Sequence, residues 1–335
     1  MGREDRLRGR RAVVRPRHVL EYVGLRAAVG VLGHLPHSVA LRIAAAAGVV
    51  LDALGWRRKE TRRRVQQVMG PACSVREVAR IARRALANFL ASLVDALHAP
   101  RFSKQWCDLH VRVVGFEHLE SARVGGRGVI LALPHLGSWE LAGLIGPWFG
   151  VPLVVLGAPQ KNPWFNRWVQ RWRERTGTRM ISRTDLNVRA VVRGLQAGDV
   201  LAIPVDIRSP QGVPVRFLGH PAWLGRGVPS LAILANVSIV PCTVYRTSWT
   251  THCVHLHPPL DPNAVEGPSA ERIQRLLQRV VDAIEPDIRA HPDQYFWFNR
   301  RWVLDPVRIA EDAPARSPSS VTSDSGPLKQ GSPAE

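Results

Sequence analysis

One stretch predicts both the fold class and a candidate site: Val129-Ile130-Leu131-Ala132-Leu133-Pro134-His135-Leu136-Gly137-Ser138-Trp139-Glu140. Its first five residues are all apolar, which is typical of a strand buried on both faces. Pro134 ends the strand, and Ser138 is placed to cap a following helix. The turn between the strand and the helix therefore presents His135.

His135 and Glu140 form the candidate catalytic pair. A histidine at the carboxyl end of a strand in an α/β protein lies where ligands commonly bind. Glu140 falls in the first turn of the helix, from which it could fold back on the imidazole and stabilise its protonated form. Such a pair can deprotonate a hydroxyl group. The alternative is a structural turn in which Glu140 only complements the start of the helix.

The composition indicates a globular protein with a strongly basic surface. The chain has 335 residues, 45% of them hydrophobic, and a formal net charge of +19. This excludes wholesale disorder and predicts a partner or surface of opposite sign, for which nucleic acid and anionic lipid are the ordinary choices. The four cysteines show no Cys-x-x-Cys spacing, so a reducing compartment fits, and no cleaved signal peptide is recognised.

The first 98 residues are predicted to contact a membrane surface. Residues 1–17 form a basic arm, and residues 18–98 form a helical, membrane-interfacial region. Two apolar stretches between His18 and Trp56 meet at Gly33-His34-Leu35-Pro36-His37, and their charged residues leave each too short for a transmembrane helix. A hairpin that lies in the interface fits this mixture, and an ordinary buried helix pair is the alternative.

Residues 99–311 are predicted to form an α/β domain, because strand and helix signals alternate along them. The predicted strands are 111–114, 129–133, 153–156, 200–205, 213–218, 238–245 and 253–256. An amphipathic helix at residues 271–290 closes the domain. Residues 312–335 are rich in serine and proline and nearly uncharged, which indicates a disordered tail.

The segment from Pro163 to Arg175 is predicted to be a helix with proline at its first position. Tryptophan and arginine recur every four residues on two neighbouring stripes of it: Trp164, Trp168 and Trp172, and Arg167, Arg171 and Arg175. A tryptophan edge beside an arginine edge suits a headgroup interface, or a groove that holds an acyl chain and a phosphate. The alternative is that the tryptophans face the core and the arginines face water.

The loop Asp206-Ile207-Arg208-Ser209-Pro210-Gln211-Gly212 also follows the carboxyl end of a predicted strand. Arg208 could hold a phosphate by bidentate hydrogen bonds, and Asp206 could orient either Arg208 or His135. A purely structural turn built on Ser-Pro and Gly is the alternative.

Other site types lack support in the sequence. His252, His255 and His257 suggest a metal site, but only the last two share a strand face and no acidic ligand lies close in the sequence, so no metal is predicted. The serine-hydrolase elbow Gly-x-Ser-x-Gly is absent, as are the glycine-rich signatures of nucleotide-binding enzymes.

Taken together, these residues resemble the bacterial lysophospholipid-acyltransferase superfamily, and within it the lipid A late acyltransferases and the phosphatidylinositol mannoside acyltransferases. His135 to Glu140 matches the His-x4-Asp/Glu motif of that group in its strand-to-helix setting. Further landmarks follow in the expected order: residues 115–119, 175–177, 181–183, Asp206 with 217–219, 239–241, and 292–302. The resemblance spans roughly residues 18 to 305.

The resemblance implies a glycerol-3-phosphate acyltransferase-like fold, with a mixed, largely parallel central sheet flanked by helices. It implies transfer of a fatty acyl chain from a thioester of acyl carrier protein or coenzyme A to a hydroxyl of a membrane glycolipid such as a lipid A precursor. A lysophospholipid or another lipid is the alternative acceptor. No cofactor and no metal are expected, because the thioester is already activated.

The implied roles fall on residues already singled out. His135 is expected to be the general base, and Glu140 to orient it and stabilise its positive charge. The residues expected to bind substrate are Arg175, Arg183, Asp206, Arg208, Trp164 and Trp168.

The expected location is the cytoplasmic face of the inner membrane, with peripheral or monotopic attachment to an anionic surface. An acidic acyl carrier protein would suit the positive charge of the chain. A nucleic-acid-binding protein is a distant alternative that rests on charge alone. Because no nucleic-acid-binding motif supports it, no nucleic-acid partner is expected.

Overall fold

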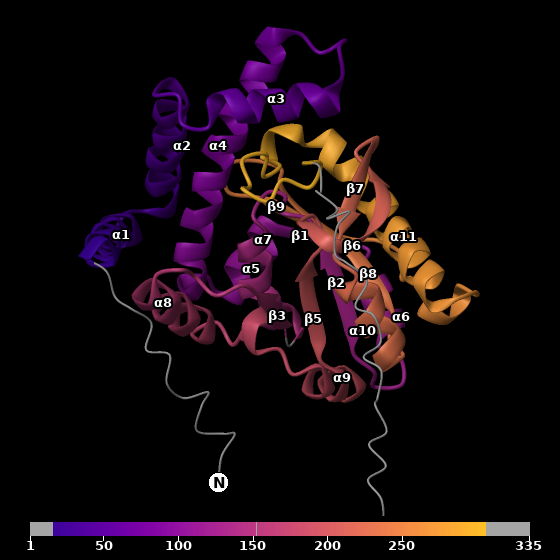
Figure 1. Cartoon of the computed structure of the whole chain (residues 1–335). Helices are drawn as coiled ribbons and strands as arrows, with labels where there is room; N and C mark the ends of the chain where they lie inside the picture. The colour runs from indigo at the N-terminus through magenta and orange to yellow at the C-terminus, as the bar shows by residue number, and fades with distance from the viewer. Residues whose placement is uncertain (1–15, 152, 306–335) are drawn as a thin grey trace, which may run out of the picture.

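The computed structural model describes residues 16–151 and 153–305, which form a group of N-terminal helices and an α/β unit (Figure 1). The predicted disordered tail at residues 312–335 lies outside the described residues, and so does nearly all of the predicted basic arm at residues 1–17.

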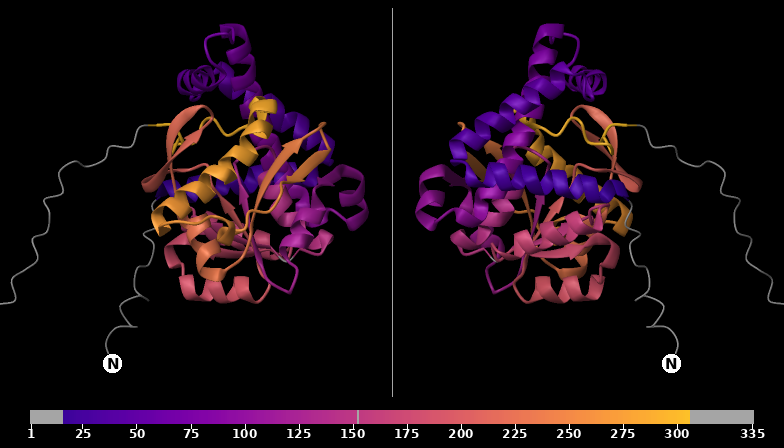
Figure 2. Two further views of the ribbon diagram at one scale, coloured as in Figure 1. Left: turned by 90° about the vertical axis from the view of Figure 1, so that its right-hand side faces the viewer. Right: turned by 90° about the vertical axis from the view of Figure 1, so that its left-hand side faces the viewer.

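The N-terminal helices are α1 (Pro16–His34), α2 (His37–Ala53), α3 (Arg58–Met69) and α4 (Val75–His98). The two predicted apolar stretches thus become α1 and α2, and they meet at the predicted turn. The side chain of Ser74 accepts a hydrogen bond from the backbone N–H of Glu77 at the start of α4, as the capping pattern predicts. Helix α3 lies at one end of the molecule and helix α9 (Val188–Gln196) at the other (Figures 1 and 2), while α1 lies at the side (Figure 1).

Helices α2 and α4 approach each other closely. A Cβ atom added to Gly48 of α2 would lie 2.6 Å from the Cα atom of Ala87 in α4, so only glycine fits there. Small and aliphatic side chains fill this contact: Ala40, Leu41, Ala44, Ala91 and Val94. The α2–α4 contact therefore holds α2 firmly against α4.

Helices α1 and α2 also expose apolar side chains: Leu20, Val23, Val31, Ile43, Val50 and Leu54, followed by Trp56. Among the described residues, no single helix is long and apolar enough to cross a membrane, and α2 and α3 meet the length and composition requirement only as a pair bent by 96°. The attachment of this hairpin to a membrane therefore remains a proposal.

A seven-stranded sheet forms the centre, in the order β1-β9-β8-β2-β5-β3-β4. Its strands are β1 (Val111–Val114), β2 (Val129–Leu133), β3 (Leu153–Gly157), β4 (Arg179–Ser182), β5 (Val200–Pro204), β8 (Ile239–Arg246) and β9 (His252–Leu256). In the part of the chain that the structure describes, β8 and β9 are antiparallel and the other neighbours in this sheet are parallel. The mixed, largely parallel sheet is thus confirmed.

Helices cover both faces of the sheet. They are α5 (Lys104–His110), α6 (Phe116–Ala122), α7 (Trp139–Ile145), α8 (Pro163–Glu174), α9, α10 (Gly227–Ala235) and α11 (Ser269–Ala290). Apolar side chains of α9, α10 and α11 pack into the larger core cluster, and side chains of α6 and α7 pack on the opposite face. The predicted helices at 163–175 and 271–290 are confirmed as α8 and α11.

Two strands were not predicted, and a third begins earlier than predicted. Strand β6 (Arg208–Phe217) forms a hairpin with β7 (His220–Leu224), and it starts five residues before the predicted position. Strand β7 contains Pro221, which argues against a strand in sequence but is tolerated in a two-stranded hairpin. Strand β4 is a four-residue edge strand with Arg179 and Ser182 at its ends, so its apolar signal is too short to detect.

The register of β2 against β5 sets the position of the candidate site. These parallel strands pair Leu133 with Pro204. His135 lies two residues after Leu133, and Asp206 lies two residues after Pro204. Because parallel strands end at the same edge of a sheet, the two side chains meet there although 71 residues separate them.

Candidate active site

His135 and Asp206 form a hydrogen-bonded pair at the carboxyl edge of the sheet. The Nδ1 atom of His135 lies 2.6 Å from Oδ1 of Asp206, and the backbone N–H of His135 donates to Oδ2 at 2.9 Å. The exposed fraction of the side chain is 14% for His135 and 3% for Asp206. The carboxylate thus fixes both the backbone and the ring of His135, and it leaves Nε2 as the nitrogen that can accept a proton.

Each member of this pair stabilises the charged form of the other. Burial alone would lower the pKa of His135, but the charge and hydrogen bond of Asp206, with a smaller contribution from Glu140, raise it above its ordinary value. Burial alone would raise the pKa of Asp206, but contacts from His135 and the Tyr295 hydroxyl lower it. Burial and Asp206 raise the pKa of Tyr295 well above its usual range, so the phenol remains a neutral donor. The site is built to hold an imidazolium beside a carboxylate.

Glu140 has a different partner from the one that the sequence predicts. Its oxygens Oε1 and Oε2 accept hydrogen bonds from Nη2 of Arg173 at 2.6 and 2.7 Å. The sequence-based expectation that Glu140 orients the imidazole is corrected here, because Nδ1 of His135 is bonded to Asp206. The physical reason is the direction of the side chain: from the first turn of α7, Glu140 reaches Arg173 on α8.

The turn that carries His135 is held by a segment from the far end of the chain. The backbone N–H of Gly137 donates to the carbonyl of Gln294, and the N–H of Phe296 donates to the carbonyl of His135, at 3.0 and 3.1 Å. Gly137 has a positive φ of 54°, and a Cβ atom there would lie 2.5 Å from the carbonyl oxygen of Val244. Glycine therefore lets the turn lie directly against β8.

Ser138 precedes α7 as predicted, but its side chain does not cap the helix. Its hydroxyl donates to Oδ2 of Asp95 at 2.7 Å. Asp95 is fully buried on α4, where Nε2 of His37 lies 2.9 Å from Oδ1 and the guanidinium of Arg246 contacts Oδ2. A buried carboxylate requires such partners, so Asp95 draws the Ser138 hydroxyl away from the helix backbone. This network connects α2, α4, α7 and β8.

A large apolar cavity opens beside His135. Its volume is about 1090 Å³, slightly above the range of roughly 300–1,000 Å³ for small-molecule sites. The walls include aliphatic side chains from four strands of the sheet, among them Leu131, Val155, Ala202 and Val244. Five arginines also line it: Arg173, Arg183, Arg208, Arg226 and Arg301. The cavity therefore combines a large, mostly apolar interior with arginine side chains and His135 in its wall.

The structure brings only some of the predicted substrate-binding residues to this cavity. Arg183 and Arg208 line it, together with His135 and Glu140, and Asp206 reaches the site through His135. Arg175 is exposed, and its guanidinium lies 5.5 Å from the ring centre of Trp172. Arg175 therefore does not belong to the wall of this cavity.

The tryptophans of α8 lie outside the cavity wall as well. Trp164 packs edge-to-face on Tyr22 of α1, and Trp168 stacks on Trp172, with ring centres 5.6 and 5.4 Å apart. All three tryptophans are half-buried. They therefore neither face the core fully nor lie fully exposed, as a headgroup-facing edge would. Their contacts place them where α8 meets the N-terminal helices.

Comparison with known protein families decides the class of the protein. A family model described as "Bacterial lipid A biosynthesis acyltransferase" matches residues 8–303. The chain belongs to this family. The match confirms the resemblance found in the sequence, and with it the acyltransferase class.

The individual proteins that match this chain share only about a quarter of its residues. A lipid A biosynthesis palmitoleoyltransferase of Escherichia coli (strain K12) is 25% identical over 310 residues, which cover 89% of this chain and 95% of that protein. A lipid A biosynthesis acyltransferase of Haemophilus influenzae is 25% identical over 213 residues, which cover 63% of each protein and so less than two thirds of its length. A phosphatidylinositol mannoside acyltransferase of Mycolicibacterium smegmatis is 23% identical over 255 residues, or 74% of this chain and 80% of that protein.

Sequence reasoning missed three residues in or next to the candidate site: Arg173, Tyr295 and Asp95. Arg173 lies on the predicted helix, but outside the two stripes that drew attention, and it faces Glu140. Tyr295 lies within a family landmark at residues 292–302, but no local pattern indicates that its hydroxyl meets Asp206. Asp95 interrupts an apolar helix near its end, and a charge within an apolar stripe is the signal that could have revealed it.

Proposed function

We propose that the protein transfers a fatty acyl chain from a thioester to a hydroxyl of a membrane glycolipid of the lipid A precursor type. The observation that supports this most strongly is a histidine fixed by a buried carboxylate at the edge of a large apolar cavity. The family of the chain supports acyl transfer to a glycolipid. The identity of the thioester carrier, acyl carrier protein or coenzyme A, is part of the proposal.

The reaction proceeds through general-base catalysis by His135. Its Nε2 removes the proton from the acceptor hydroxyl as the oxygen attacks the thioester carbonyl. Asp206 stabilises the imidazolium that forms. When the tetrahedral intermediate collapses, the carbon–sulfur bond breaks, the ester remains, and the leaving thiolate takes the proton from His135. No cofactor or metal takes part, because the thioester supplies the activated acyl group.

The two kinds of wall in the cavity suit the two ends of such a substrate. The aliphatic walls accommodate the acyl chain, whose burial stabilises binding by about 0.8 kcal/mol per methylene. Arg183 and Arg208 lie where a phosphate of the donor or the acceptor can accept their hydrogen bonds. Arg173 lines the same cavity and is paired with Glu140.

The acceptor can be tested directly. The purified protein in detergent is incubated with palmitoyl thioesters of acyl carrier protein and of coenzyme A, each with a lipid A precursor, a phosphatidylinositol mannoside and a lysophospholipid. We expect mass spectrometry to find one added acyl group on the lipid A precursor, and none with the His135→Ala variant. Acylation of the phosphatidylinositol mannoside alone would replace the proposed acceptor, because relatives of both kinds match this chain. Absence of all products would contradict the proposed reaction.

We also propose that α1 and α2 attach the enzyme to the cytoplasmic face of the inner membrane through their exposed apolar side chains. Leu54 is 77% exposed after α2, and Val124 is equally exposed before the amino end of β2. In flotation with anionic liposomes, Leu54→Glu should bind more weakly than the unchanged protein, whereas Val124→Glu should not. Equal flotation of both variants would contradict attachment through this region.

A further inference from the structure

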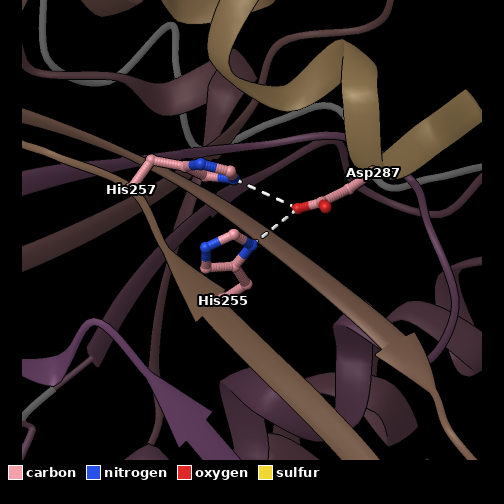
Figure 3. A group of neighbouring side chains, drawn as sticks. All are labelled: His255, His257 and Asp287. Atoms are coloured by element: carbon pink, nitrogen blue, oxygen red, sulfur yellow. Dashed lines mark hydrogen bonds and ion pairs between the residues drawn. The ribbon is translucent and has the colours of Figure 1, made fainter. Parts of the chain in front are cut away.

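Two histidines and an aspartate converge on the face of the sheet that α11 covers (Figure 3). Oδ2 of Asp287 lies 2.9 Å from Nδ1 of His255 and 3.2 Å from Nε2 of His257. The sequence suggested that no acidic ligand lies near these histidines, but the fold brings Asp287 to them from another element. This cluster is separate from the pair formed by His135 and Asp206.

Strand pairing and helix packing explain why the three residues meet. His255 and His257 are two positions apart, so both side chains project from the same face. His255 pairs with Thr243 on β8, and the Thr243 hydroxyl donates to Oδ2 of Asp287. Helix α11 packs on this face through buried residues such as Ile284 and Ile288, which places Asp287 between them above the strands.

We propose that His255, His257 and Asp287 bind a divalent transition-metal ion, with Zn²⁺ as the best fit. Two imidazole nitrogens and one carboxylate are borderline ligands that suit Zn²⁺, whereas Mg²⁺ and Ca²⁺ prefer oxygen ligands alone. Bonds of about 2.0–2.1 Å in a tetrahedral site separate the ligand atoms by roughly 3.3 Å. The two separations from Oδ2 are close to this value, and all three ligand atoms lie within 4.8 Å of one another.

A salt link without metal accounts for the cluster less well. The centres of the two imidazole rings are only 4.0 Å apart, and the nitrogens of both rings that face Asp287 share its single oxygen Oδ2. Nε2 of His257 is shielded from solvent, and its nearest acidic oxygen among the described residues is Oδ2 of Asp287 at 3.2 Å. A metal ion that binds both imidazoles and the carboxylate would give this nitrogen a partner.

The bond network assigns this ion a structural role. Asp287 lies in the last turn of α11, and seven residues later Gln294 contacts the turn that carries His135. A metal ion at the cluster would fix the end of α11 to β9 and so the start of the segment that holds this turn. The proposal does not depend on the acyl transfer reaction, and no step of that reaction passes through the ion.

The test uses the full-length protein in detergent, freed of metal with a chelator. In isothermal titration with Zn²⁺ we expect one tight site per chain, and Co²⁺ should give the visible absorption of a four- or five-coordinate complex. The double variant His255→Gln/His257→Gln should weaken this binding by at least about 100-fold, because it removes two direct ligands and the loss of one outer-shell partner alone costs about 10–100-fold. As a matched control, His34→Gln/His118→Gln removes two histidines outside the cluster and should bind as the unchanged protein does.

Two further measurements keep the result decisive if the double variant folds poorly. Asp287→Asn keeps the shape of the side chain and should also weaken Zn²⁺ binding. The melting temperature of the unchanged protein should rise with Zn²⁺, because an ion that binds only the folded state stabilises it. Absence of a tight site in the unchanged protein would overturn the proposal. Equal affinity of the cluster variants and the control would also overturn it.

Discussion

Two carboxylates lie near His135, and they differ in burial, in hydrogen-bond partner and in distance from His135 along the chain. Asp206 comes from a loop 71 residues away, is almost fully buried, and bonds both to the ring and to the backbone of the histidine. Glu140 is five residues away, has 31% of its side chain exposed, and bonds to Arg173. The carboxylate closer in sequence is thus not the one that is hydrogen-bonded to His135.

The difference follows from how each residue is placed. Two neighbouring parallel strands fix the position of Asp206, so its distance from His135 is set by the hydrogen-bond register of the sheet. Glu140 is placed by the start of a helix, which turns its side chain toward α8. The short sequence motif therefore contains the histidine but not the carboxylate that is hydrogen-bonded to it.

Among substitutions of the residues around His135, removal of the charge of Asp206 is expected to have the largest effect. The reference is His135→Ala, for which we expect kcat to fall by roughly 10² to 10⁴. Asp206→Asn should lose about 10² or more, since the imidazolium forms without its carboxylate. Removing the anion lowers the pKa of His135, so the acid limb of kcat/KM should move to lower pH. An Asp206→Asn variant with normal kcat and an unmoved limb would refute the pairing.

Glu140→Gln should have a smaller effect, about tenfold or less in kcat, because its contribution to the pKa of His135 acts through space only. The acid limb should move in the same direction as in Asp206→Asn, but less far. KM should change as well, since Arg173 loses its partner and gains free charge in the cavity. A greater loss in Glu140→Gln than in Asp206→Asn would reverse the comparison.

Tyr295→Phe should have the smallest effect. It removes one neutral hydrogen bond to Asp206, which is worth about 0.5–1.5 kcal/mol, and leaves the charge in place. Without this donor the pKa of Asp206 rises slightly, and kcat should fall severalfold at most with KM unchanged. Unchanged kcat together with an unchanged acid limb would show that Tyr295 only fills space.

Much of the fold was predictable, because it rests on local signals. Residues 129–133 form a buried strand as their apolar run predicts, and residues 163–174 form a helix as their proline and spacing predict. The weak cases are β4 and β7, where a short edge strand and a proline remove those signals. Local sequence patterns thus predict β2 and α8, whereas β4 and β7 form through pairing with neighbouring strands that no local pattern indicates.

The site was predictable only in part, because it depends on contacts between distant segments. His135 was identified from the turn that presents it, and Asp206 from its place after a strand. No local signal distinguishes Asp206 from Glu140 as the partner, since the choice depends on which strand neighbours β2. The same limit applies to Asp287, which meets His255 only after α11 packs on the sheet.

The close contact of α2 with α4 bears on how this enzyme can be produced and engineered. A hairpin that only anchors a protein can be cut away to leave a soluble catalytic fragment. Here, truncation before residue 57 would remove His37, whose ring is hydrogen-bonded to the buried Asp95. Leaving this carboxylate oxygen without its partner would lower the free energy of unfolding by about 1–3 kcal/mol. The truncation would also uncover the small residues of α4 against which Gly48 packs. Point substitutions on the outer surface of the hairpin, rather than deletions, are therefore the way to test the proposed membrane attachment without disturbing this packing.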